Sequence, residues 1–487
     1  KTHSDLRLIE MGGRSLDTID LRSAAESELI RLASEINETV SLTVLEQNQT
    51  IYVDVRRASN PLSVGVEIGR HLPVFESSSG RAILAALPPH RVNRLLDALP
   101  SDKQAEVLSD FAISRARGSS IALSESIEGV IVIAVPVIGP PDMGCGAIVV
   151  TALADRIPLE RRHIIGRDLM EAARRIMGTI GSAPLSIVPN PRPSRHVEAD
   201  LKCVAPVGAV VGEGPVWDAS AKLLRWVDFA APTVHAFDPA TGNDRVDPAP
   251  FLVSAILPAD NGKAFASTQN GIASFDPETM AFSPLYNPEQ HLVSNRLNDA
   301  KTDSAGRIWA GSMSLDASMP SGSLYRFDAP TTAQAVDGGF QVSNGIAWAP
   351  DDKTIYFVDS AIGTIFAYDF DVKTGETSNR RSLITVPSEM GKPDGICVDS
   401  AGNIWAAMWD GWCVNCYDPT GLLLRTINMP VPRPTSLCHG GDDLKTLYIT
   451  SASIRLSAEF LEEAPLSGGL FSIEVETPGL PTNLVRA

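Results

Sequence analysis

A short residue pattern recurs along the second half of this chain and limits what the chain can fold into. In each copy, a polar residue is followed by a short apolar run, an Asp- or Gly-rich turn and a further strand-like segment. The clearest copies are Ser294–Met313, Ser343–Tyr356 and Pro393–Trp405, and looser ones are Glu213–Leu224, Ser254–Phe265 and Thr435–Tyr448. A repeat of roughly 40–50 residues is the length of a β-propeller blade. The pattern therefore predicts a six-bladed β-propeller.

When the copies are aligned on the turn, their first positions form an equivalent set. The set consists of Glu213, Ser254, Asn298, Asn344, Asp394 and Thr435. The innermost strand of each blade faces the central channel, so equivalent positions lie on a ring around the axis. This ring is rich in oxygen atoms and has no His or Cys, which favours a divalent cation such as Ca²⁺, Mg²⁺ or Mn²⁺. Zn²⁺ would bind through carboxylates, without its usual nitrogen and sulfur ligands.

A purely structural interpretation of the same positions stays open. Asn and Asp at strand starts often hydrogen-bond the turns beside them. That interpretation is harder to sustain for four polar residues at equivalent positions than for one. His439 follows the sixth position closely, and we expect it to belong to a turn.

Turns that begin with Asp supply a second repeated signal. DPATG, DPETM, DAPTT and DPTG follow strand-like segments such as VHAFD, IASFD, LYRFD and VNCYD. Turns of this kind after short strands predict a second strand in most blades. We expect Leu201–Val207 to close the propeller by pairing with the last blade. Residues 200–487 are then all-β.

The first 180 residues mix helices and strands. We expect a helix from Leu21, a strand at Leu62–Ile68, a helix from about Ser78 and an Arg-rich helix up to Ile180. The apolar segments VIVIAVPVIG and CGAIVVTAL read as two further strands around a tight loop. The prediction is an α/β (α+β) domain over residues 1–180, with helices packed on an antiparallel sheet. Residues 181–199 are rich in Pro and form the expected linker.

Composition limits the partners. The formal net charge is −17, of which −2 falls in residues 1–199 and −15 in the remainder. An acidic propeller is a poor candidate for binding a phosphate backbone. Six Cys in 487 residues do not make a disulfide framework, and neither a signal peptide nor an apolar run of membrane-spanning length is present. We therefore expect a cytoplasmic protein that does not enter a membrane.

The N-terminal part resembles the effector-binding domain of IclR-type transcriptional regulators from Ser15 to Ile180. The motifs that carry the resemblance are LPVFESSSGRAILAAL, the segment RARG…EGVIVIAVPV and GAIVVTAL. The resemblance implies a small-molecule effector and a homo-oligomer formed through this domain. That family carries a DNA-binding winged helix upstream, and Lys1–Ser15 looks like its tail. DNA binding is expected only if that module precedes this sequence.

The propeller resembles the regucalcin/gluconolactonase family of sugar-lactone hydrolases, also called the senescence marker protein family. The motifs are GEGPVW, NRLNDAKTDSAGRIWAGSM, SNGIAWAPDDKTIYFVDS and KPDGICVDSAGNIW. The resemblance implies one divalent metal ion (Ca²⁺, Mn²⁺, Mg²⁺ or Zn²⁺) held by Glu213, Asn344 and Asp394. It also implies substrate contacts from Arg296, Asn298 and an acidic residue at Asp316.

Hydrolysis of a sugar lactone to its aldonic acid suits these residues. A cation can polarise the lactone carbonyl, and a carboxylate beside it can accept a proton from water. Asp394 is our candidate for that catalytic base, although Glu213 would serve equally well. Arg296 could hold sugar hydroxyls and oppose the developing negative charge.

The leading hypothesis is a metal-dependent sugar lactonase joined to an IclR-like sensing domain. A non-catalytic sensor of lactones or sugar acids, serving a transcriptional regulator, is the alternative. A calcium-handling protein would explain the ring but not Arg296.

Overall fold

Our computed structural model describes most of the chain between residues 21 and 486. Residues 59–63, 88, 97–98, 125–126, 140–143, 181–189, 191–196, 293, 316 and 318, and several positions between 101 and 116, lie outside the description. The chain separates into two units, Lys1–Ile187 and Val188–Ala487. Among the described residues, no helix is both long and apolar enough to cross a membrane.

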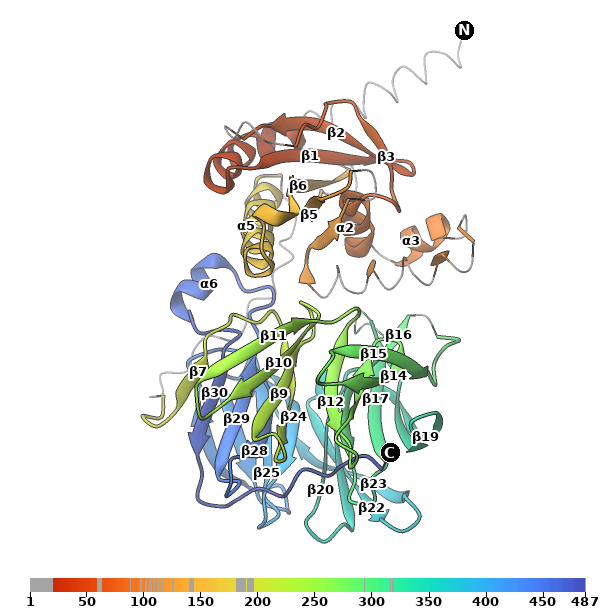
Figure 1. Cartoon of the computed structure of the whole chain (residues 1–487), viewed down its shortest axis with the longest axis vertical. Coiled ribbons are helices and arrows are strands. Elements are labelled where there is room, and N and C mark those ends of the chain that lie inside the picture. The colour runs from red at the N-terminus through yellow and green to blue at the C-terminus, as the bar shows by residue number, and fades with distance from the viewer. Residues whose placement is uncertain are drawn as a thin grey trace. The chain divides into compact units, whose positions relative to one another are not determined.

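The N-terminal unit is built on one antiparallel sheet with the strand order β3-β2-β1-β6-β5-β4 (Figure 1). The strands are β1 Thr39–Glu46, β2 Gln49–Arg56, β3 His71–Pro73, β4 Ser120–Leu123, β5 Val130–Ile138 and β6 Cys145–Leu153. The helical elements are a helix over residues 21–36, α2 Ser78–Ala86, α3 Pro89–Leu96, η1 Ala154–Arg156 and α5 Leu159–Thr179.

Both faces of this sheet are covered. Alternate residues of β5 and β6 pack on one side against the helix 21–36 and α5, as Ile133, Ile148 and Leu169 do. On the other side, Ala134 and Val149 pack against α2 and α3. Two covered faces explain why β5 and β6 are apolar almost throughout, since neither face meets water.

The expected strand at Leu62–Ile68 is wrong. Residues 64–70 contain no strand, and residues 59–63 lie outside the description. The Arg70 amide donates to the Glu67 carbonyl across a turn, and Gly69 has a φ of 84°. This positive φ suits glycine and interrupts an extended segment, so strand β3 begins only at His71.

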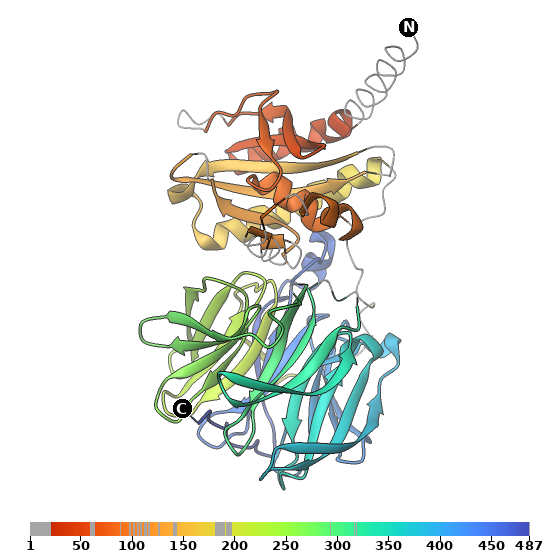
Figure 2. The same cartoon turned by 90° about the vertical axis from the view of Figure 1, so that its right-hand side faces the viewer.

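The C-terminal unit contains, within its described residues, six antiparallel sheets of four strands each, which confirms the predicted six-bladed propeller (Figure 2). Blades 1 and 2 comprise β8 Gly212–Asp218, β9 Leu223–Asp228, β10 Thr233–Asp238, β11 Asn243–Pro248, β12 Val253–Pro258, β13 Ala264–Thr268, β14 Gly271–Asp276 and β15 Ala281–Tyr286. Blades 3 and 4 comprise β16 Asn295–Thr302, β17 Ile308–Ser314, β18 Gly322–Ala329, β19 Thr332–Phe340, β20 Ser343–Trp348, β21 Thr354–Asp359, β22 Thr364–Asp371 and β23 Glu376–Thr385. Blades 5 and 6 comprise β24 Lys392–Val398, β25 Ile404–Trp409, β26 Cys413–Tyr417, β27 Leu423–Asn428, β28 Pro434–Gly440, β29 Thr446–Ser451, β30 Leu470–Glu474 and β7 Lys202–Ala205. Short helices η2 Ser360–Ile362, η3 Ser388–Met390 and α6 Ala458–Glu463 lie between strands.

Strand β7 closes the ring as predicted, because it is the outermost strand of blade 6 and pairs with β30 (Figure 1). After β30 the chain continues as a segment that we call the strap, Gly479–Arg486. Backbone hydrogen bonds tie the strap to Leu444, Pro258 and Gly306. The Asn483 side chain adds a bond to the Thr302 carbonyl. The strap therefore joins blades 2, 3 and 6 at the end of the channel where the innermost strands finish.

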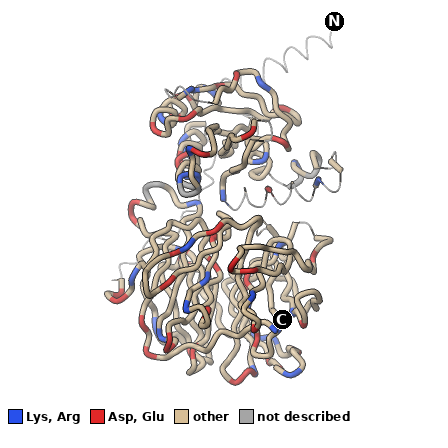
Figure 3. The backbone as a smooth tube through the Cα atoms, viewed as in Figure 1, with Lys and Arg blue, Asp and Glu red and all other residues tan. Residues whose placement is uncertain are grey.

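The recurring Asp-Ser-Ala-Gly turns hold a tryptophan in place. The Asp399 carboxylate accepts hydrogen bonds from the Ala401 and Asn403 amides and from the Trp405 indole. Asp303 accepts from the Trp309 indole in the same way. Acidic residues mark many other propeller turns, as Figure 3 shows in red. The Asp-Pro turns follow the third strand of their blades, β10, β14, β18 and β26, and not the second as expected.

Candidate functional site

The innermost strand of every described blade breaks its hydrogen-bonded register at the same level. The shifts fall at Glu213/Val216, Val253/Ala255, Leu297/Ala300, Ser343/Ile346, Pro393/Ile396 and Pro434/Leu437. A β-bulge leaves residues unpaired and redirects their side chains, and bulges are common beside active sites. The six aligned polar positions lie at or beside these shifts.

Two of the six side chains already have hydrogen-bond partners within the β-sheet framework. The Ser254 hydroxyl donates to the Ser267 hydroxyl at 3.0 Å, on the second strand of the same blade. The Thr435 hydroxyl donates to the Gly212 carbonyl of blade 1 and contacts the Thr450 hydroxyl of its own blade at 2.9 Å. These two positions fit the structural interpretation.

His439 lies within β28 and not in the turn that the sequence predicted. Its backbone pairs with Leu447 of β29, so the strand continues past Thr435 as far as Gly440.

Three polar side chains of blades 3 and 4 form one connected group. Arg296 donates to the Asn298 side-chain oxygen. The Asn298 amide nitrogen donates to the Asn344 side-chain oxygen at 2.6 Å. The Asn344 amide nitrogen donates to the Ser360 hydroxyl at 2.8 Å, and Ser360 donates to the Pro393 carbonyl. This chain of bonds fixes the Asn344 amide so that its oxygen faces Asn298.

Glu213 and Asp394 add two carboxylates to this group. Burial, followed by repulsion from Asp299, raises the pKa of Glu213 to about 8. Burial, with repulsion from Glu213 and then Asp299, raises the pKa of Asp394 well above its usual value, and the Asn344 hydrogen bond opposes that rise. Glu213 and Asp394 are therefore close enough to interact electrostatically with each other and with Asp299.

Arg296 also contacts residues outside this chain of hydrogen bonds. Its guanidinium lies over the Phe229 ring at 4.2 Å and donates to the Met313 sulfur at 3.4 Å. Burial lowers the pKa of Arg296 to about 10, and Glu213 partly offsets that effect. The group stays positively charged at neutral pH and stands close enough to Glu213 to interact with it.

The side chains fit a hard divalent cation. Glu213 and Asp394 offer anionic oxygens, and the Asn344 oxygen has a second lone pair beside the one that Asn298 uses. With Glu213, Asp299 and Asp394 ionised against Arg296 and Lys301, the group carries one net negative charge, which favours a bound cation. Among the described residues, no cluster of three His, Cys, Asp or Glu side chains is arranged as a metal site. The two carboxylates and the Asn344 amide oxygen would make up an oxygen-only set.

Asp316, the remaining predicted substrate contact, lies outside the described residues. Sequence reasoning overlooked Asp299, Ser360 and Phe229. Asp299 stands next to Asn298, and regular strand alternation would place neighbours on opposite faces. The bulge between Leu297 and Ala300 removes that alternation, so both side chains join one group.

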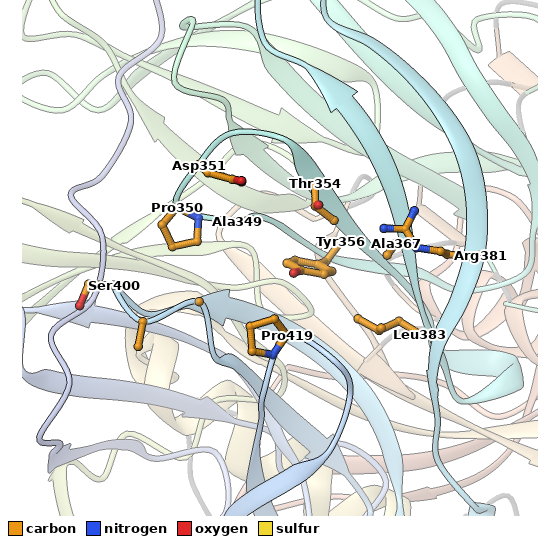
Figure 4. Close-up of a pocket in the computed structure, with 12 residues that line it drawn as sticks. Ala349, Pro350, Asp351, Thr354, Tyr356, Ala367, Arg381, Leu383, Ser400 and Pro419 are labelled. Atoms are coloured by element: carbon orange, nitrogen blue, oxygen red, sulfur yellow. The ribbon is translucent and has the colours of Figure 1, made fainter.

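A separate hollow of about 410 Å³ lies away from the axis, between blades 4 and 5 (Figure 4). Tyr356, Arg381 and Pro419 line it, and Figure 4 shows their side chains around the opening. Arg381 is already ion-paired with Asp369 at 2.8 Å. The guanidinium that lines the hollow therefore already has an ionic partner and does not require a polar ligand.

Comparisons with known proteins agree on both units. Residues 211–453 match the family described as SMP-30/Gluconolactonase/LRE-like region, and residues 13–177 match Bacterial transcriptional regulator IclR C-terminal. Regucalcin of Gallus gallus is 32% identical over 56% of this chain and 93% of its own length. The 6-deoxy-6-sulfogluconolactonase of Pseudomonas putida is 35% identical over 57% of this chain and 96% of its own length. Among solved structures, a calcium-binding protein, regucalcin, from Agrobacterium tumefaciens superposes with a TM-score of 0.57 at 26% identity, over 58% of this chain and 97% of its own.

Proposed function

Because the chain belongs to the SMP-30/gluconolactonase family through its propeller and carries an IclR C-terminal effector domain, we propose that it hydrolyses a sugar lactone to the aldonic acid and senses a small molecule. The observation that carries this proposal is the connected axial group of Arg296, Asn298 and Asn344 beside Glu213 and Asp394. A lactonase of this kind needs both an electrophilic centre and groups that bind hydroxyls, and this group offers both. The similarity to a sulfogluconolactonase supports the lactone class.

Glu213, Asn344 and Asp394 would hold one divalent cation. Ca²⁺, Mn²⁺ and Mg²⁺ suit the oxygen-only set, and Zn²⁺ would bind through the carboxylates. When bound, the cation would supply Lewis acidity at the lactone carbonyl oxygen.

Asp394 is the proposed base. It is 4% exposed, and in that buried setting its raised pKa makes the ionised carboxylate a strong proton acceptor. Water adds to the lactone carbonyl carbon, and its proton passes to Asp394. The ring C–O bond then breaks, so that the products are a carboxylate and a hydroxyl, with one proton released. Glu213 stands near enough to share the role.

Arg296 and Asn298 would bind the sugar. The Arg296 guanidinium offers donors to ring hydroxyls and to the oxygen that gains negative charge, and Asn298 keeps that guanidinium in place. Asp316 would accept a hydrogen bond from a sugar hydroxyl.

The second candidate is a non-catalytic sensor. The N-terminal effector domain favours it, because a regulator could read the lactone or sugar acid that the propeller binds. In either case we propose a cytoplasmic protein that self-associates through its N-terminal domain. DNA binding would need a winged helix preceding this sequence.

A hydrolysis assay separates the two candidates. The purified protein is stripped of metal and supplied with Ca²⁺, Mn²⁺, Mg²⁺ or Zn²⁺, and acid release from aldono-lactones is followed with a pH indicator. We expect metal-dependent turnover that Asp394→Ala abolishes. Ser254→Ala is the matched control, because Ser254 holds the equivalent position in blade 2 but bonds to Ser267. Saturable sugar-acid binding without turnover under every metal would favour the sensor.

A further inference from the structure

Trp409 differs from the other tryptophans of this chain because it is partly exposed. The sequence contains seven Trp, and the structure describes all of them. The six buried ones, each at most 7% exposed, are Trp217, Trp226, Trp309, Trp348, Trp405 and Trp412. Trp409 is the last residue of strand β25 in blade 5. A large aromatic side chain left partly exposed on a rigid strand is a candidate for contact with a ligand.

The strand register places Trp409 at the level of the axial group. Its backbone pairs with Lys392, which lies two residues before the candidate cation ligand Asp394. Two residues span about 7 Å along an extended strand, and neighbouring strands lie about 5 Å apart. A ligand held at Asp394 is therefore within reach of the indole.

Residues at the equivalent position in other blades contact the axial group. Like Trp409, each lies on the second strand opposite the residue two before the aligned polar position of its blade. Met313 and Phe229 both contact the Arg296 guanidinium, through sulfur at 3.4 Å and through the ring at 4.2 Å. Ser360 accepts a hydrogen bond from Asn344 at 2.8 Å. The repeat thus puts Trp409 among side chains that surround the candidate site.

A buried arginine fixes the indole in place. The Arg433 guanidinium lies over the Trp409 ring at 5.0 Å, and Arg433 is 1% exposed. It is ion-paired with Asp410 at 2.6 Å. The Trp412 amide donates to the Pro432 carbonyl, which ties the turn after β25 to blade 6. The cation–π contact covers one part of the ring, and a ring already held in place loses little freedom when a ligand binds.

Arg433 and Arg296 hold equivalent positions in opposite blades of the six. Arg296 pairs with Met313 in blade 3, and the Arg433 carbonyl accepts the Ala452 amide in blade 6. Each guanidinium covers an aromatic ring, but the exposure differs. Beside Arg296 the Phe229 ring is buried and the guanidinium is partly exposed, whereas beside Arg433 the guanidinium is buried and the indole is partly exposed. One pair therefore offers a charge to a ligand, and the other offers an aromatic face.

We propose that Trp409 stacks on the ring of the substrate lactone and distinguishes it from the open-chain acid, an inference that rests on the proposed function. A closed lactone ring presents a rigid face of C–H groups, which the indole contacts favourably. The hydrolysed acid is a flexible chain that must lose rotational freedom to keep that contact. Trp409 thus strengthens binding of the substrate more than binding of the product.

The first test uses the exposure of the indole in the unaltered full chain. Acrylamide quenches the fluorescence of exposed tryptophan, so Trp409 should account for most of the quenching. The probe is D-gluconolactam, which has an amide in place of the lactone ester and is not a lactonase substrate. With Ca²⁺ present, the lactam should reduce acrylamide quenching saturably, and Trp409→Phe should remove that response. Unchanged quenching of the parent protein at every lactam concentration would overturn the proposal.

The second test separates stacking from general damage to the site. Calorimetry measures binding of the lactam and of D-gluconate to the parent, to Trp409→Phe and to Trp409→Leu. We expect Trp409→Leu to weaken lactam binding about tenfold, as for the loss of one aromatic contact, and to change gluconate binding little. Trp409→Phe keeps an aromatic face and should retain most of the affinity for the lactam.

Two results of the calorimetry would contradict the proposal. They are equal losses for lactam and gluconate in Trp409→Leu, and equal lactam affinities in all three proteins. Because neither ligand is turned over, both tests are independent of hydrolysis. A protein that binds the lactam through Trp409 but hydrolyses no lactone would contradict the proposed function alone.

Discussion

Asp394 and Ser254 occupy equivalent positions in their blades but have different surroundings. Ser254 is bonded to its own blade, whereas Asp394 receives a hydrogen bond from Asn344 of the neighbouring blade and is repelled by Glu213. Equivalent backbone positions thus carry either a residue that only stabilises its blade or a residue suited to the proposed chemistry. Which of the two applies depends on whether the second strand of the blade supplies a hydrogen-bond partner.

A pH prediction follows from Glu213 in metal-depleted protein. Its folded pKa of about 8 exceeds the usual 4.5, so the folded state binds the proton more tightly than the unfolded state. The stability that this group contributes is complete below about pH 4.5 and is lost as pH rises through 8. Glu213→Gln mimics the protonated group, so with chelator present the two proteins should be equally stable at low pH. Near pH 8 the free energy of unfolding of the parent should be lower than that of the variant, by on the order of 4 kcal/mol. Denaturant unfolding of both proteins between about pH 4.5 and 8 measures this difference. A difference in free energy of unfolding that becomes smaller as pH rises would contradict the prediction.

Arg296→Lys should keep the positive charge but lose the two-pronged geometry. We expect kcat/KM for the lactone to fall about 10²-fold, as when one transition-state donor is removed. Steady-state kinetics at saturating metal measure this. Arg381→Lys, on the outer part of blade 4, is the control and should leave kcat/KM unchanged. Equal decreases in kcat/KM for both variants would contradict the role proposed for Arg296.

The alignment of the repeats predicted Glu213, Asn298, Asn344 and Asp394 as equivalent positions, and the family resemblance added Arg296. The structure brings them together on the axis, while their roles stay predictions. Asp299 was overlooked since bulges are not visible in a strand pattern, and its neighbour Asn298 satisfied the alignment alone. Asp316 lies outside the described residues and remains a prediction.

At the scale of elements, the turn between β24 and β25 shows how a short motif fixes a blade. Asp399 is fully buried and bonds two turn amides and the Trp405 indole, which packs between blades 5 and 6. Asp418 accepts the Thr420 and Leu422 amides in a similar turn, but that turn is exposed to solvent. In both turns an Asp carboxylate accepts two backbone amides, but only the turn at Asp399 is buried.

We therefore expect Asp399→Ala to reduce the free energy of unfolding by about 2–4 kcal/mol, because it leaves a buried indole and two amides unpaired. Asp418→Ala should cost much less, since water can replace the lost carboxylate. Urea unfolding of both variants compares them. Similar decreases in the free energy of unfolding of the two variants would show that burial of Asp399 does not determine how much it stabilises the protein.

Element prediction failed where local signals were ambiguous. The segment before β3 has apolar residues at strand spacing, yet Gly69 and the turn at Glu67–Arg70 end the extended conformation. Asp-Pro turns were assigned to the second strand because sequence shows where a strand ends but not its rank in a blade. The β7–β30 pairing was predictable since only a distant strand could complete the fourth position of blade 6.

For the whole molecule, two units with separate cores account for most of the described chain. The propeller holds the candidate cation ligands, and the N-terminal unit carries the effector-domain fold. A cation that binds only the folded propeller should stabilise that unit alone.

Calorimetry of the full chain should then show two unfolding transitions. Addition of Ca²⁺ or Mn²⁺ after chelation should raise the Tm of one transition and leave the other unchanged, and Glu213→Gln should abolish that increase. A single transition that moves as a whole would contradict independent units.

The most direct test of the central claim is a metal titration of lactone hydrolysis. Metal-depleted protein receives increasing amounts of the most activating cation while aldono-lactone turnover is measured. Our account predicts a rate that rises to a plateau at about one equivalent, with no rise in Glu213→Gln. Full turnover in the metal-depleted protein, or none with any of the four cations, would contradict a metal-dependent lactonase.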